Sequence, residues 1–228
     1  MKKYELTTNT KMVLGKKLFQ IRALVSFGDV KEGELGGWIE KEENLSQEGD
    51  AWASENARVS GNARVFGDAW VSGNARVYGN ARVSENARVY GNARVSENAW
   101  VSENARVSEN AWVYGNAWVY ENARVYGNAW VSENARVYGN ARVSENAKIK
   151  TDKDYTIVQG FGREQRSTTF FRCADGEIRT QCGCFYGTIE EFRAKVKETH
   201  GDSKYAKEYL MIADLMEYHF NESEGEDE

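Results

Sequence analysis

Small and apolar residues recur with a period of six along the middle of this chain. From Ala51 to Ala147 an alanine stands at every sixth position, in 17 units without an insertion, and Arg or Trp followed by Val continues most units. A helix would spread these residues around its circumference, because six is not a multiple of 3.6. Strands would instead point Ala and Val inward and Arg or Trp outward, with Ser/Tyr-Gly/Glu-Asn steps as corners. The pattern therefore predicts a mainly β protein built around a solenoid.

The unit Val-[Ser/Tyr]-[Gly/Glu]-Asn-Ala-[Arg/Trp] resembles the hexapeptide repeat of left-handed β-helix proteins. This resemblance implies a left-handed triangular parallel β-helix with three units per coil, so that residues 18 apart stack about 4.8 Å from each other. The left-handed sense rests on the resemblance alone, since ordinary crossover connections are right-handed. Another type of β-solenoid is the alternative. With the segments 35–46 and 182–209, the repeats also look like uncharacterised hexapeptide-repeat proteins of bacterial prophages and phages, a group without an agreed activity.

Stacking at 18 residues predicts three columns of outward side chains. One column is mostly arginine and begins with Trp52 and Trp70, and each of the other two contains a further tryptophan pair. Like charges about 5 Å apart repel, so arginine ladders need nearby carboxylates, counterions or a polyanion. These columns are either structural ladders that stabilise the solenoid or a recognition surface. The candidate binding residues are Arg88, Arg106, Arg124, Arg142, Trp100, Trp118, Trp112 and Trp130.

Asparagine recurs at almost every corner of the predicted solenoid, with Asp68 as the exception. Asparagine tolerates left-handed backbone, and stacked amides can hydrogen-bond to one another. We therefore expect the corner asparagines to adopt left-handed backbone and to form amide ladders along the solenoid.

The flanking segments lack the period and predict caps. Residues 1–50 contain a hairpin pattern and form the N-terminal capping segment, and residues 51–150 form the β-helix. Residues 151–228 form a small α+β module with strands near 155–158, 168–173 and 178–182, two helices (βββαα) and an acidic tail from Asn221 to Glu228. Caps matter because an open coil is an edge that invites polymerisation.

The three cysteines lie in the last third of the chain and favour buried thiols over a metal cluster. A two-residue turn at 175–176 would place Cys173 opposite Ile178. Phe171, Cys173, Ile178 and Cys182 would then share one apolar face.

The composition points away from catalysis and membranes. The net charge is −5 at pH 7, no apolar run reaches 18 residues, and the first residues lack a signal peptide, so we expect a cytoplasmic protein, in the host cell if it is phage-encoded. Acyltransferases and carbonic-anhydrase-like enzymes of the resembled family use histidines on or beside the coils, but residues 51–147 contain no histidine and no inserted loop. Ice-binding solenoids display threonine ladders, and residues 51–150 contain no threonine. We expect neither an enzyme nor a bound cofactor or metal.

These features favour a non-enzymatic phage or prophage interaction protein that presents a rigid surface to a protein partner. The most specific version of this hypothesis is that the protein inhibits a host defence protein, such as a CRISPR effector or another nuclease. One alternative is a structural scaffold that polymerises end to end or associates as a dimer or trimer. Another is nucleic-acid binding through the arginine and aromatic ladders. The balance of 12 cations and 9 anions in residues 51–150 weakens that last hypothesis.

Overall fold

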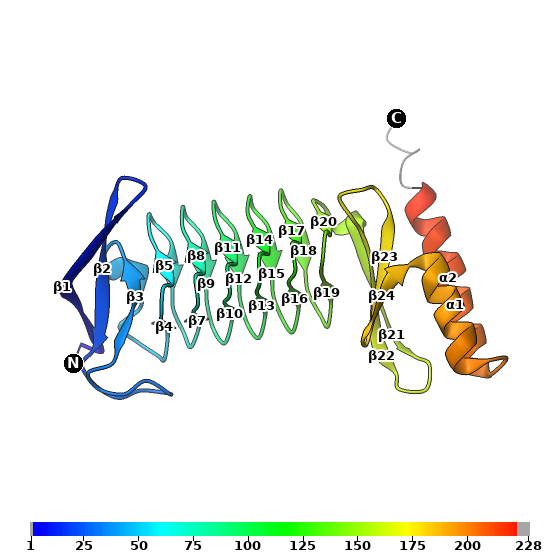
Figure 1. Ribbon diagram of the computed structural model, residues 1–228, viewed down its shortest axis with the longest axis horizontal. Helices are drawn as coiled ribbons and strands as arrows, with labels where there is room; N and C mark the ends of the chain where they lie inside the picture. The colour runs from blue at the N-terminus through cyan, green and yellow to red at the C-terminus, as the bar shows by residue number, and fades with distance from the viewer. Residues whose placement is uncertain (1, 223–228) are drawn as a thin grey trace.

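The computed structural model describes residues 2–222 and shows an elongated molecule with a parallel β-solenoid at its centre (Figure 1). The hairpin of β1 (Tyr4–Val13) and β2 (Lys16–Ala23) stands at one end. A four-stranded antiparallel sheet and two helices stand at the other end. The acidic tail expected at residues 221–228 lies, from residue 223 onward, outside the described residues.

The solenoid has three faces, each a parallel sheet with one short strand per coil. The arginine face consists of β4 (Trp52–Ala53), β7 (Trp70–Val71), β10 (Arg88–Val89), β13 (Arg106–Val107), β16 (Arg124–Val125) and β19 (Arg142–Val143). The Trp100 face consists of β6 (Arg64–Val65), β9 (Arg82–Val83), β12 (Trp100–Val101), β15 (Trp118–Val119) and β18 (Arg136–Val137). The Trp112 face consists of β3 (Leu35–Ile39), β5 (Arg58–Val59), β8 (Arg76–Val77), β11 (Arg94–Val95), β14 (Trp112–Val113), β17 (Trp130–Val131) and β20 (Lys148–Ile149).

Residues 18 apart pair across neighbouring coils, which confirms the predicted stacking. Arg88 pairs with Arg106, and Trp100 pairs with Trp118. The alanines from Ala51 to Ala147 and the valines two positions after them are buried in one continuous core. The inward and outward alternation inferred from the period of six is therefore correct. The left-handed sense of the coil stays a prediction from the resemblance.

The corners differ from the expectation for asparagine. The residue before each asparagine, Gly or Glu, has the left-handed backbone, as in Glu85 with φ 56° and Gly91 with φ 67°. Among residues 2–222 no asparagine has a positive φ. The asparagines do form the expected amide ladder, as where Asn98 accepts a 3.0 Å hydrogen bond from Asn80 and donates one of 3.0 Å to Asn116. Their side chains are thus committed to links between coils, and the left-handed turns of residues 51–150 are shared equally by eight glycines and eight glutamates.

Backbone hydrogen bonds outside the strand ladders run in one direction along the solenoid, because N–H groups at the strand starts and corners donate to carbonyls of the next coil. Arg88 N, for example, donates to Ala105 O at 2.9 Å. At these positions the first coil therefore presents carbonyl acceptors at its open edge, and the last coil presents N–H donors. A polar group left unpaired at a buried edge is costly, so each end needs a cap of opposite hydrogen-bonding character.

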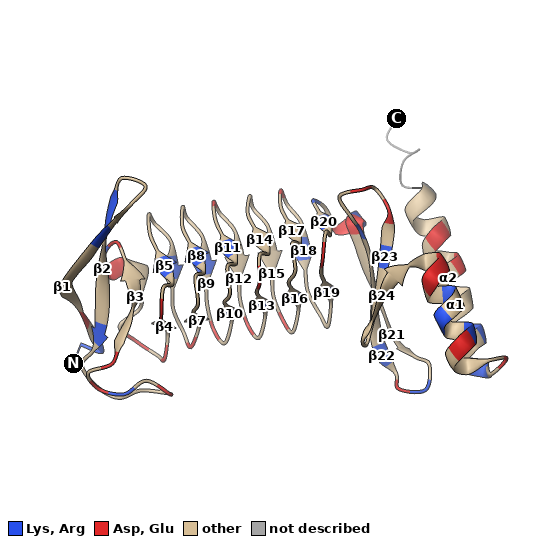
Figure 2. Ribbon diagram, in the orientation of Figure 1, with Lys and Arg blue, Asp and Glu red and all other residues tan. Residues whose placement is uncertain are grey.

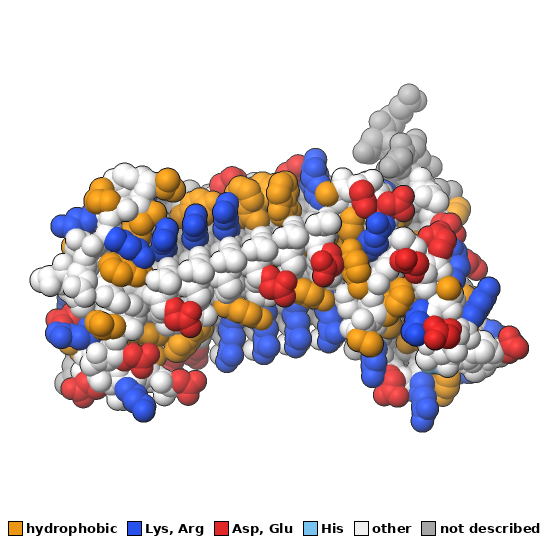
Figure 3. All heavy atoms as spheres, viewed as in Figure 1, with side chains coloured by type: hydrophobic (Ala, Val, Ile, Leu, Met, Phe, Trp, Pro, Cys, Tyr) orange, Lys and Arg blue, Asp and Glu red, His pale blue; other side chains and the backbone are white. Residues whose placement is uncertain are grey.

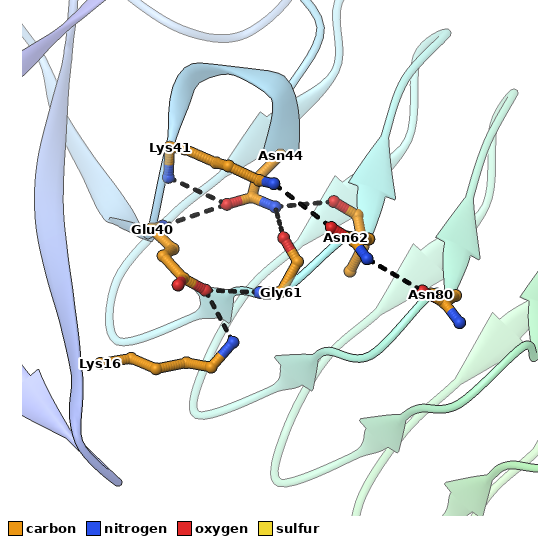
Figure 4. Close-up of polar contacts among 8 residues, drawn as sticks. Lys16, Glu40, Lys41, Asn44, Gly61, Asn62 and Asn80 are labelled. Carbon is orange, nitrogen blue, oxygen red and sulfur yellow. Dashed lines mark hydrogen bonds and ion pairs between the residues drawn. The ribbon is translucent and has the colours of Figure 1, made fainter.

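The N-terminal cap supplies donors to the first coil. β3 pairs in parallel with β5 and antiparallel with β2, so the hairpin continues the sheet of the Trp112 face. After the 3-10 turn η1 (Glu42–Asn44), the Asn44 amide donates to the carbonyls of Gly61 and Ala63 at 3.0 and 2.8 Å. Figure 4 shows Asn44 directly preceding the ladder that continues from Asn62 to Asn80.

The C-terminal cap supplies acceptors to the last coil. Asp152, in the 3-10 turn η2 (Asp152–Asp154), accepts a 2.7 Å hydrogen bond from the N–H of Arg136. Thr169 Oγ1 accepts one of 3.0 Å from the N–H of Arg142. Both open edges of the solenoid are therefore met by side chains of the flanking segments.

The C-terminal module has one strand more than expected. Its strands are β21 (Tyr155–Phe161), β22 (Arg166–Arg172), β23 (Ile178–Cys182) and β24 (Phe185–Thr188), in that order in the sheet. Helices α1 (Ile189–His200) and α2 (Lys204–Glu222) follow. The β24 segment Phe-Tyr-Gly-Thr is short and lacks alternation, so its strand character comes from pairing with β23.

The predicted apolar face with Cys173 and Cys182 is wrong, because the strand register differs from the prediction by one residue. Arg172, not Cys173, pairs with Ile178, because the connecting loop has three residues and ends in Gly176 with a φ of 85°. Phe171 and Cys173 consequently pack on the solenoid core, while Ile178 and Cys182 pack against the helices. A one-residue slip in register moves a side chain to the opposite face of a sheet.

Candidate functional site

Charges of opposite sign occupy different parts of the solenoid. Arginines stand on the strands and glutamates stand at the corners (Figure 2). Within residues 2–222, none of the ten arginines of the repeats pairs with a carboxylate within 4 Å; the ion pair found in the repeats joins Lys150 to Glu133 at 3.4 Å. Two corner glutamates, Glu97 and Glu109, instead accept backbone N–H groups from Gly115 and Gly127 at 3.1 Å each. The arginine columns thus remain uncompensated cation ladders.

The arginine ladder, which we define as Arg88, Arg106, Arg124 and Arg142, is brought together in register by β10, β13, β16 and β19. The first three side chains are exposed, and the guanidinium of Arg142 donates to the carbonyl of Gly183 at 3.3 Å. Figure 3 shows such rows of basic side chains running along the solenoid axis. Four candidate residues predicted from the sequence therefore form one continuous cationic stripe.

The stripe leads into a groove where the solenoid meets the C-terminal module. The groove has a volume of about 500 Å³, and Arg166 of β22 contributes a further cation to it. The sequence does not indicate Arg166 as a site residue, because it lies outside the repeats, where no period predicts its neighbours. The groove is lined by Asn122, Arg124, Asn140, Arg142, Arg166, Ser167, Gly183 and Cys184.

The Trp100 face carries a continuous aromatic row. The rings of Trp100 and Trp118 are stacked, with centroids 5.0 Å apart and planes 6° apart. Tyr120 continues the row 4.6 Å from Trp118 and stacks on Tyr138 at 5.4 Å. Arg82 lies over Trp100 at 5.8 Å, a cation–π distance. The stacked pairs Trp100–Trp118 and Tyr120–Tyr138 thus join neighbouring coils.

The Trp112 face carries the other predicted pair in a different geometry. Trp112 and Trp130 meet edge to face, with centroids 6.0 Å apart and planes 78° apart. Trp130 is 43% exposed, and Arg94 lies 5.6 Å from the Trp112 ring. Because the two tryptophan pairs and the arginine ladder occupy three different faces, the eight candidate residues do not form one site.

The first tryptophan pair of the arginine column is not a surface pair. Trp52 is fully buried, because Tyr4 and Phe27 of the N-terminal cap cover its ring at 6.3 and 5.4 Å. Trp70 in the next coil is half-buried. An 18-residue column identifies outward positions but not the cap that covers the first of them.

The cysteines are free thiols in three different environments. Cys173 is buried, which raises the pKa of its thiol, Cys182 is half-buried, and Cys184 is exposed. Within residues 2–222 no group of three or more His, Cys, Asp or Glu side chains could hold a metal ion. Over the same residues, no helix combines the length and the apolar character needed to cross a membrane.

The three stacked faces and the buried Ala and Val core define a β-solenoid repeat protein. Comparison with known families gives the same class: the chain is similar to the YdcK β-solenoid repeat. No curated protein matches the chain. The matched stretches all lie in the solenoid, at residues 57–73, 69–85, 75–89, 87–103, 117–133 and 135–148.

Proposed function

We propose that this β-solenoid is a non-enzymatic interaction protein whose arginine ladder holds an acidic protein partner. The observation that carries the proposal is the in-register stack of Arg88, Arg106, Arg124 and Arg142, in which no arginine has a carboxylate of residues 2–222 within 4 Å. Like charges stacked between strands destabilise a free sheet. An anionic partner removes that repulsion when it binds, so part of the cost in the free protein returns as binding free energy.

The solenoid also holds the ladder in place before binding. Arg88, Arg106 and Arg124 extend from strands whose backbone bonds to both neighbouring coils. Arg142 extends from the last strand, where its N–H bonds to Thr169 of the cap, and a buried valine follows each of the four arginines. A preorganised surface loses less conformational entropy on association than a mobile one. The ladder thus offers cations in a fixed line to a partner.

The surroundings of the ladder favour a protein over a nucleic acid. The corner before the arginine face carries Glu85, Glu103 and Glu121, and the corner after it carries Glu109 and Glu145. These carboxylates flank the cationic stripe on both sides. A nucleic acid carries a charge on every phosphate and would meet both acidic borders, whereas a protein segment can match a narrow stripe with a few carboxylates.

The caps at the two ends of the solenoid argue against a scaffold that polymerises end to end. The carbonyl edge of the first coil is met by Asn44, and the N–H edge of the last coil by Asp152 and Thr169. Coil-on-coil growth would have to displace these bonds. Side-by-side association into a dimer or trimer is not blocked by the caps, so the experiment must distinguish it from binding to a different protein.

The test is capture of a partner by the tagged full chain in a bacterial host at physiological salt. Arg106→Glu/Arg124→Glu reverses two ladder charges, and Arg58→Glu/Arg76→Glu makes the same change on the Trp112 face as a matched control. We expect one stoichiometric acidic protein to bind the wild type and the control and to be lost from the ladder variant.

Each other result assigns a different function. Equal loss from both variants, or from neither, contradicts the ladder as the binding face. Nucleic acid alone, released steeply by salt, would indicate phosphate binding, because released counterions dominate such affinity. Recovery of the chain alone as multimers would indicate a scaffold. Recovery of a host nuclease or CRISPR effector would support the more specific hypothesis that the protein is a phage-encoded inhibitor of host defence.

A further inference from the structure

A second cavity, of about 410 Å³, lies in the C-terminal module and shares only Arg166 and Cys184 with the lining of the ladder groove. Its apolar lining includes Phe185 at the start of β24, Phe192 and Val196 of α1, and Tyr209 of α2. The Phe192 ring lies 5.6 Å from that of Phe185 and 5.7 Å from that of Tyr209. The volume falls in the range of small-molecule sites, roughly 300–1,000 Å³.

Cations gather at the rim of this cavity. Arg163, Arg166 and Lys195 line it, with Glu164 as the acidic residue among the lining residues. Neither Arg163 nor Arg166 makes an ion pair among residues 2–222, and Lys195 pairs at 2.9 Å with the exposed Glu198 of its own helix. An apolar cavity with surplus positive charge at its rim complements a ligand with an apolar body and an anionic head.

Gly183 places Arg166 at this rim. A methyl group on Gly183 would lie 2.8 Å from Nη1 of Arg166, and the φ of +61° at Gly183 is a left-handed conformation that favours glycine. The carbonyl of Gly183 also accepts a 3.0 Å hydrogen bond from Gln181. The absence of a side chain at position 183 therefore lets the guanidinium lie against the backbone beside the cavity.

Tyr209 contributes a polar group that carries no charge near neutral pH. Its hydroxyl donates a 3.3 Å hydrogen bond to the carbonyl of Phe161. Burial, with a contribution from Cys182, raises the pKa of this phenol to about 12. His200 stacks on the Tyr209 ring with centroids 5.8 Å apart. The phenol thus does not oppose an anion in the cavity.

We infer that this cavity binds a small organic carboxylate with an aromatic or branched aliphatic body. The body packs on Phe185, Phe192 and Val196, and the carboxylate faces Arg163, Arg166 and Lys195. This site does not depend on the arginine ladder, because a partner on the solenoid and a ligand in the C-terminal module contact largely different residues.

The first test uses the fluorescent dye anilinonaphthalene sulfonate, an aromatic anion, titrated into the full chain. We expect a saturable rise in fluorescence that phenylbutyrate reverses and the uncharged phenylbutanol does not. Lys195→Glu should weaken dye binding roughly tenfold, as expected for loss of a charge-assisted contact. The matched variant Lys197→Glu, on an exposed part of the same helix, should bind as the wild type does.

The second test locates the dye. Cys182 is half-buried and lines this cavity but not the ladder groove, so an occupied cavity should slow alkylation of Cys182 by iodoacetamide several-fold. The thermal unfolding midpoints of both lysine variants are measured to confirm that each is folded. The inference is overturned by an absence of saturable binding, by equal displacement with the acid and the alcohol, by equal effects of the two lysine variants, or by an unchanged alkylation rate.

Discussion

Trp118 donates a 3.1 Å hydrogen bond from its indole Nε1 to the hydroxyl of Ser102, which lies sixteen residues earlier in the chain. Trp100 and Trp112 make the same bond to the serines sixteen residues before them, at 3.0 and 3.1 Å. Position 114 is a tyrosine, and Trp130, sixteen residues later, is more exposed and meets Trp112 edge to face. In these three pairs, a serine in the previous coil therefore orients the tryptophan.

Ser102→Ala should leave the Trp118 indole N–H without its partner. Loss of one hydrogen bond in a part-buried site should lower the unfolding free energy by about 1 kcal/mol, measured by urea denaturation. Ser108→Ala is the matched control, because Ser108 is also buried but has Arg124, not a tryptophan, sixteen residues later. Equal destabilisation by the two variants would mean that serine burial, not the indole bond, matters.

Gly127→Ala and Gly139→Ala separate crowding from backbone strain at the corners. Both glycines have a φ of +66°, but a Cβ at Gly127 would lie 2.5 Å from the backbone N of Glu145, while one at Gly139 would meet Ile157 at 3.4 Å. We expect Gly127→Ala to be more destabilising than Gly139→Ala by about 1–3 kcal/mol, the usual cost of overpacking. Similar unfolding free energies for both would show that the coils can move apart at this corner.

The period of six predicted the coil length, the inward Ala and Val, and the three outward columns, because each follows from strand alternation and an 18-residue coil. The period could not predict contacts between the repeats and the flanking segments, which do not share it. The burial of Trp52 depends on Tyr4 and Phe27 of the cap, and Arg166 reaches the ladder groove only through the packing of the C-terminal sheet. The corner asparagines were misassigned because amide ladders and left-handed backbone both favour asparagine, and sequence alone did not separate them.

Lys3 should make stability depend on pH. It is 5% exposed and donates to the carbonyls of Gly49 and Ala51 at 2.9 Å each. Burial lowers its pKa from 10.5 to about 8, although Asp50 and Asp68 act in the opposite direction. Between these pKa values the unfolded chain binds more protons than the folded chain, so Lys3 makes the unfolding free energy rise with pH.

Lys3→Met should therefore reduce the increase in unfolding free energy between about pH 7 and about pH 9.5, measured by urea denaturation. Part of the increase should persist, because burial, with a contribution from Arg58, also lowers the pKa of Lys11 to about 8. Lys2→Met removes an exposed charge next to Lys3 and should keep the wild-type slope. An unchanged slope in Lys3→Met would show that Lys3 stays charged in the folded protein throughout this range.

Arg106 lies between Arg88 and Arg124 in the ladder, so it meets a like charge in each neighbouring coil. Arg106→Gln should raise the unfolding free energy at low salt by about 0.5 kcal/mol, because like charges paired across strands destabilise a sheet. The gain should disappear near 1 M salt, where the screening length falls to about 3 Å. Arg136→Gln is the control, since Arg136 pairs with Trp118 and not with another arginine.

If Arg106→Gln instead lowered stability at every salt concentration, packing by the arginine stem would outweigh repulsion. The ladder would then be a stabilising element of the solenoid, and the repulsion that an acidic partner is proposed to relieve would be absent.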